Sequence, residues 1–217
     1  MITILAKFFI HDDGDKGKLR QSYGMLCGIV GVMFNVFLFI GKFLAGTISN
    51  SIAITADAFN NLSDAGSSIV TLLGFKMAGA KPDTEHPFGH GRIEYISGLV
   101  VAAAILLMGY ELIRDSVGKI LHPEETVFNA LVAVILIASI LVKLYMAYYN
   151  HNIGKKLDSA AMRAVATDSL SDMVATTAVL LASVFTHFTG YKIDGYCGLV
   201  VGLLVGYAGF DAARETL

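Results

Sequence analysis

The chain has 217 residues, of which 55% are hydrophobic and 16% charged, and its mean hydropathy is +0.64. This composition is too apolar for an ordinary soluble domain and predicts an integral membrane protein embedded in a lipid bilayer. The formal net charge of -2 argues against nucleic acid as a partner, because binding to phosphates requires a basic surface.

In chain order, residues 1–22 are expected to form a short cytoplasmic segment, and residues 23–217 a transmembrane domain. The domain contains six apolar segments, each near the roughly 20 residues that are needed to cross the hydrocarbon core of a bilayer. We predict spanning helices over residues 25–48, 52–77, 95–121, 127–149, 159–185 and 193–213. The predicted fold class is therefore all-α, a bundle of six transmembrane helices.

Basic residues predict the orientation of this bundle. If the N-terminus is cytoplasmic, most Lys and Arg residues lie on that side, and only Arg114, Lys119 and Lys192 lie outside. Both termini are then cytoplasmic. Lys42 and Lys143 lie within apolar segments, and we expect their long side chains to extend toward a membrane interface.

Two short motifs in the second and fifth apolar segments resemble each other. Residues 58–64 place Asn60 four residues before Asp64, and residues 166–172 place Asp168 four residues before Asp172. In the predicted orientation the two copies run antiparallel, which indicates an inverted repeat of helices 1–3 and 4–6. Repeats of this kind are typical of transporters that bind substrate at the repeat interface.

These four side chains predict a metal site near the middle of the membrane. An ionised carboxylate at that depth costs at least about 2.5 to 3.5 kcal/mol, and neither motif contains a Lys or Arg to neutralise it. Simple helix pairing would explain one acid, but not three acids and an amide at matched spacing. The oxygen donors suit Mn²⁺, Mg²⁺ or Ca²⁺ better than Zn²⁺ or Cu⁺. Protons that occupy the empty site and leave when a cation enters would give proton-coupled exchange.

Three motifs, at residues 60–64, 86–94 and 168–172, together resemble the cation diffusion facilitator family of divalent metal exporters. The resemblance extends from about residue 21 to the end of the chain. It implies a homodimer of six-helix domains that exchanges cytoplasmic metal for external protons by alternating access. It also implies a transporter with no bound cofactor rather than an enzyme.

The resemblance also bears on the choice of metal. Zinc-transporting members carry at least one His at the positions matched by Asn60, Asp64, Asp168 and Asp172, and this sequence carries none. The sequence therefore resembles the manganese-exporting bacterial branch, and the expected location is the bacterial plasma (inner) membrane. The alternatives are a Zn²⁺ or Fe²⁺ exporter of the same family and a passive divalent cation channel, with Co²⁺ and Cd²⁺ as further candidate cargoes.

A second metal site is implied by the same resemblance. Some relatives use an Asp and two His in the loop after the second helix, and Asp83, His86 and His90 stand at the matching positions. Contact of this loop with the bilayer or with a partner is the alternative role.

Members usually continue into a cytoplasmic α/β domain, and we expect that domain to be absent here. An intramembrane aspartyl protease is disfavoured because the sequence has no Gly-x-Gly-Asp motif.

Overall fold

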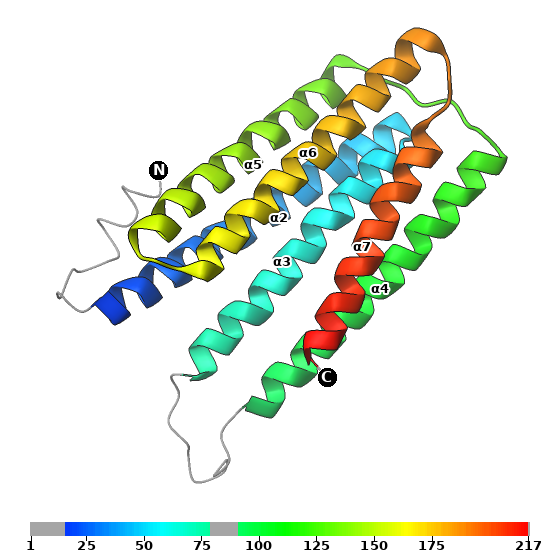
Figure 1. Ribbon diagram of the computed structural model, residues 1–217. Coiled ribbons are helices and arrows are strands. Elements are labelled where there is room, and N and C mark those ends of the chain that lie inside the picture. Colours follow the sequence, from blue (N-terminus) through cyan, green and yellow to red (C-terminus); the bar gives the residue numbers. More distant parts are fainter. Residues whose placement is uncertain (1–15, 79–90, 217) are drawn as a thin grey trace.

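The computed structural model describes residues 16–78 and 91–216, and the regular elements in these ranges are all α-helices (Figure 1). The helices are α2 (Lys16–Ser49), α3 (Ile52–Ala78), α4 (Gly91–Leu121), α5 (Ala130–Lys156), α6 (Ala160–Thr189) and α7 (Asp194–Thr216). The predicted all-α class is confirmed, and each predicted segment falls on one of these six helices.

Consecutive helices run in opposite directions, so that α2 begins and α7 ends at the same end of the bundle (Figure 1). The closest pairs are α4 with α7, α2 with α3, and α5 with α6, whereas α3 and α6 make few contacts with each other. Among the described residues, α2, α5 and α6 contain stretches that are long and apolar enough to cross a membrane. That α3, α4 and α7 also cross the membrane stays a prediction.

Two clusters of buried apolar side chains hold the helices together. One involves α2, α5 and α6 near the end where α2 begins, and its members include Cys27, Met146 and Met162. The other lies toward the opposite end and includes Ile54 and Leu136. The polar motifs of α3 and α6 therefore lie between two apolar clusters.

Small residues allow α4 and α7 to approach each other closely. A Cβ atom added to Gly109 of α4 would lie 2.8 Å from the Cα atom of Gly206 of α7. The two backbones are therefore in direct contact at this point, as is common where membrane helices pack.

Polar side chains define several helix ends. The side chain of Asn129 accepts a hydrogen bond from Val132 N at 3.0 Å and caps the start of α5. Asp194 at the start of α7 accepts a hydrogen bond from Ile52 N at 2.8 Å, so α7 caps the neighbouring helix α3.

Large apolar side chains on the outside of the bundle, such as Phe37 at 70% exposure, are suited to contact with lipid.

Candidate metal site between α3 and α6

The structure brings the two predicted motifs together. Residues four apart lie on one face of a helix, so Asn60 and Asp64 project from α3, and Asp168 and Asp172 project from α6. Because the two helices are antiparallel, Asn60 meets Asp172 and Asp64 lies near Asp168. The Asn60 Nδ2 atom donates a hydrogen bond to Asp172 Oδ1 at 2.6 Å.

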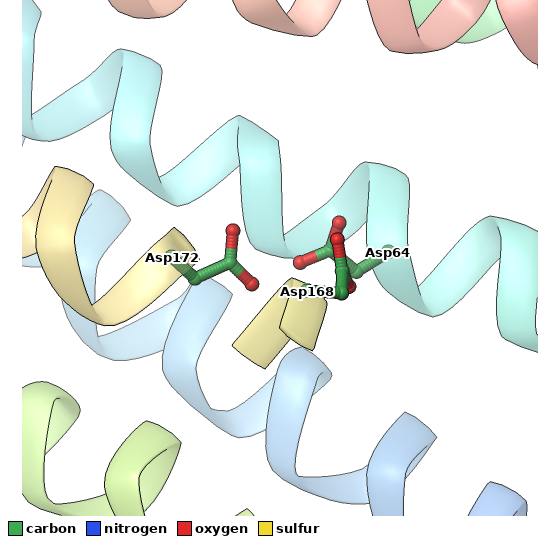
Figure 2. A group of neighbouring side chains, drawn as sticks. All are labelled: Asp64, Asp168 and Asp172. Carbon is green, nitrogen blue, oxygen red and sulfur yellow. The ribbon is translucent and has the colours of Figure 1, made fainter. Parts of the chain in front are cut away.

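The three carboxyl groups of this quartet converge on one point. One oxygen atom from each of Asp64, Asp168 and Asp172 lies within 4.8 Å of the others, and Figure 2 shows the three groups turned toward one another. Asp172 is buried, Asp64 is partly buried and Asp168 is exposed. Asp168 is also the acid nearest the end where α6 begins. Oxygen atoms at such separations can coordinate one hard cation together.

A lysine from a third helix reaches into this cluster. Lys143 of α5 is 1% exposed, and its Nζ atom donates hydrogen bonds to Asp64 Oδ2 at 3.1 Å and to Asp172 Oδ2. A third bond, of 2.8 Å, goes to Asn35 Oδ1 on α2. The prediction that Lys143 extends to a membrane interface is wrong, and the buried acids are partly neutralised by its ammonium group.

The position of Lys143 along its helix explains this outcome. The residue lies thirteen positions from each end of α5, which at 1.5 Å per residue is about 20 Å from either end. A lysine side chain is much shorter than this distance. The predicted segment ended at residue 149, only six positions after Lys143, and the longer helix of the structure is what places this lysine at the middle, where a partner inside the bundle is favoured.

Lys42 of α2 is also buried, contrary to the prediction, and belongs to a second polar cluster. Its Nζ atom lies 2.9 Å from Asp57 Oδ2 and donates a hydrogen bond to Thr176 Oγ1 at 2.8 Å. Thr176 Oγ1 in turn donates to Asp57 Oδ1 at 3.2 Å. We call these three residues the outer triad. They lie about one helical turn from Asn60 and Asp172, toward the end where α3 begins.

The other predicted site cannot be placed in the same way. Asp83, His86 and His90 lie outside the described residues. The loop site therefore stays a prediction.

Comparison with known proteins identifies the family. Residues 28–217 match the model of the cation efflux transmembrane domain. The chain is 32% identical to the uncharacterized transporter MJ0449 of Methanocaldococcus jannaschii, over 84% of this chain and 65% of that protein.

Two further relatives have more specific names. The manganese efflux system protein MneS of Bacillus subtilis is 27% identical, over 81% of this chain and 60% of its own length. A cadmium, cobalt and zinc/H(+)-K(+) antiporter of the same species is 24% identical, over 95% of this chain and 64% of its own length. The chain thus spans about two thirds or less of each of these three proteins.

The match to the family model covers nearly all of the six described helices and includes the α3 and α6 motifs as well as Lys143. It agrees with the multi-pass membrane protein and the transporter class that the sequence predicted. The chain belongs to the cation efflux family, the cation diffusion facilitators that its motifs resemble.

Proposed function

We propose that this protein exports a divalent metal cation from the cytoplasm in exchange for protons, with Mn²⁺ as its main cargo. The ligands are Asn60, Asp64, Asp168 and Asp172. The observation that carries the proposal is the convergence of three carboxylate oxygens within 4.8 Å, at a place where two antiparallel helices present matched motifs.

The donor atoms support Mn²⁺ over softer metals. All four ligands offer oxygen, and carboxylate and carbonyl oxygens suit Mn²⁺ better than sites of imidazole or thiolate would. The names of the relatives divide between manganese and a group of cadmium, cobalt and zinc. Zn²⁺ or Fe²⁺ is therefore the alternative cargo of the same transport mechanism.

The outer triad supports a carrier rather than a passive channel. Lys42 and Asp57 are each 0% exposed and pair with one another about a turn beyond the quartet. A channel needs a continuous polar path, whereas a carrier closes one side while the other is open. In this arrangement the outer triad places a buried, paired set of side chains beyond the quartet, where a channel would need an open polar path.

Charge balance supports exchange with protons. A divalent cation that enters a group of acids displaces the positive charge already held there, and protons are one form of that charge. We further propose that the protein works as a homodimer in the bilayer, with residues 1–22 on the cytoplasmic side.

Transport into reconstituted vesicles tests the ligand assignment. We expect Asp64→Ala and Asp172→Ala each to lower the initial rate of Mn²⁺ transport at least about tenfold, because each removes a metal ligand. Glu111→Ala is the matched control, since Glu111 is an exposed acid on α4 away from the quartet. If the two aspartate variants carried Mn²⁺ as fast as the parent and the control, the proposed site would be wrong.

A further inference from the structure

We propose that Lys143 is a tethered cation that occupies the quartet between transport events and withdraws onto Asn35 when the metal ion enters. The inference rests on the proposed function, because it takes the quartet as the place where the metal binds. It assigns a role in metal binding to a residue outside the two repeated motifs.

The contacts of Lys143 place a positive charge among the ligands. Its Nζ atom bonds to Asp64 and Asp172, one acid from each motif, and thereby joins α3 to α6 through α5. The same two carboxyl groups each have an oxygen within 4.8 Å of the other and of one from Asp168, close enough to coordinate a metal ion together. The ammonium group and a metal ion therefore compete for the carboxyl groups of Asp64 and Asp172.

A metal ion and the ammonium group cannot share these oxygens. Two positive charges a few ångströms apart repel strongly inside a protein, where the effective dielectric is low. The carboxylates would also have to supply both a coordination shell and the acceptors for the ammonium protons. One cation must therefore leave as the other arrives.

Asn35 provides a second acceptor for the displaced ammonium group. Its side chain is 4% exposed and comes from α2, which carries neither motif, and its Oδ1 atom already accepts a bond of 2.8 Å from Nζ. The amide oxygen carries no charge and belongs to neither motif. Lys143 can therefore keep its charge and one hydrogen bond while it releases both carboxylates.

This exchange would have two consequences for transport. A carrier without metal still has a cation among its buried acids, so it can change conformation with less uncompensated charge at its centre. A cargo ion must also attract the carboxylates more strongly than the ammonium group does. A divalent ion meets this requirement more readily than a monovalent ion.

Equilibrium Mn²⁺ binding to the purified chain in lipid nanodiscs tests the inference, with electron paramagnetic resonance to measure free Mn²⁺. In Lys143→Met the competitor is removed and most of the side-chain volume is kept, so we expect the dissociation constant for Mn²⁺ to fall at least about tenfold. If Lys143 only held the helices together, the variant would bind Mn²⁺ equally or more weakly. Either of those results would overturn the proposal.

The control uses Lys42, which is also buried. In Lys42→Met/Asp57→Leu an internal ion pair is removed about one turn away, but no charge is taken from the quartet. We expect its dissociation constant to stay within about threefold of the parent value. A decrease equal to that of Lys143→Met would mean that any buried lysine has this effect, and would overturn the specific role of Lys143.

A second variant tests whether Asn35 accepts the displaced ammonium group, and it does not depend on whether Lys143→Met folds. In Asn35→Leu the ammonium group has no acceptor left outside the quartet, so we expect Mn²⁺ binding to weaken several-fold. The double variant Lys143→Met/Asn35→Leu should bind as tightly as Lys143→Met alone. Unchanged affinity in Asn35→Leu would overturn the withdrawal onto Asn35.

The same measurement separates this inference from the proposed function. If Asp64→Ala and Asp172→Ala abolish Mn²⁺ binding but Lys143→Met does not tighten it, the quartet stands and the tethered cation is wrong. If those aspartate variants bind Mn²⁺ as the parent does, the quartet is not the metal site and both proposals fail.

Discussion

Asp168 is the acid of the quartet that is exposed, which makes it the ligand that is easiest to replace without disturbing buried contacts. Asp168→His would introduce one imidazole nitrogen into an all-oxygen site. Because imidazole suits Zn²⁺ better than Mn²⁺, we expect the ratio of Zn²⁺ to Mn²⁺ transport to rise about tenfold. The measurement is competitive uptake of the two metals into vesicles.

Glu111→His is the matched control for this exchange, since it places an imidazole on the exposed surface of α4. It should leave the ratio of the two metals unchanged. An unchanged ratio in Asp168→His as well would show that the chemical softness of the ligands does not select the metal.

At the scale of single residues, the quartet could be predicted because helical spacing and the repeat are both local patterns. The partners of Lys143 could not be predicted in this way, since Asp64 lies 79 positions and Asp172 lies 29 positions from it in the chain. The rotation of α5 about its own axis decides which side chains face the centre. Apolar residues lie on all sides of α5, so its sequence does not reveal that rotation.

The outer triad connects three elements, since Lys42 comes from α2, Asp57 from α3 and Thr176 from α6. Asp57→Leu would leave the Lys42 ammonium group buried without its counter-ion. Loss of one partner of a buried pair typically lowers the free energy of unfolding by about 3 to 5 kcal/mol. Unfolding of the variant in detergent by heat or by denaturant measures this loss.

The double variant Lys42→Met/Asp57→Leu tests whether the unpaired ammonium group causes the loss of stability. Replacing both charges by apolar side chains of similar size should restore most of the lost stability, because no buried charge is left alone. If the double variant were as unstable as Asp57→Leu, the loss would come from altered packing and not from the unpaired ammonium group.

At the scale of elements, the six helices could be predicted because length and hydropathy are properties of contiguous sequence. Their ends were less accurate. Residues 127–129 were predicted as helix, but Asn129 caps α5 and the helix begins at Ala130. Gly198, Gly202 and Gly206 recur at four-residue spacing in α7, a local pattern for close helix packing, but the pattern does not say which helix is the partner, and α4 could not be predicted as that partner.

For the whole molecule, the alternating directions of the helices place successive connections at opposite ends. Lys156 at the end of α5 lies at the end of the bundle where α2 begins, and Glu125 lies in the connection at the other end (Figure 1). Both side chains are exposed. The distribution of Lys and Arg predicts that the Lys156 end is cytoplasmic.

Labelling in intact cells with a membrane-impermeant maleimide tests this orientation, after Cys27 and Cys197 are replaced by Ala. We expect Glu125→Cys to react in intact cells and Lys156→Cys to react only after the membrane is permeabilised. The orientation decides which side of the membrane the Asp168 end of the quartet faces and which side the outer triad faces. If the labelling were reversed, the Asp168 end of the quartet would face away from the cytoplasm. The distribution of Lys and Arg would then have predicted the wrong orientation, and the end where α2 begins would lie outside the cell.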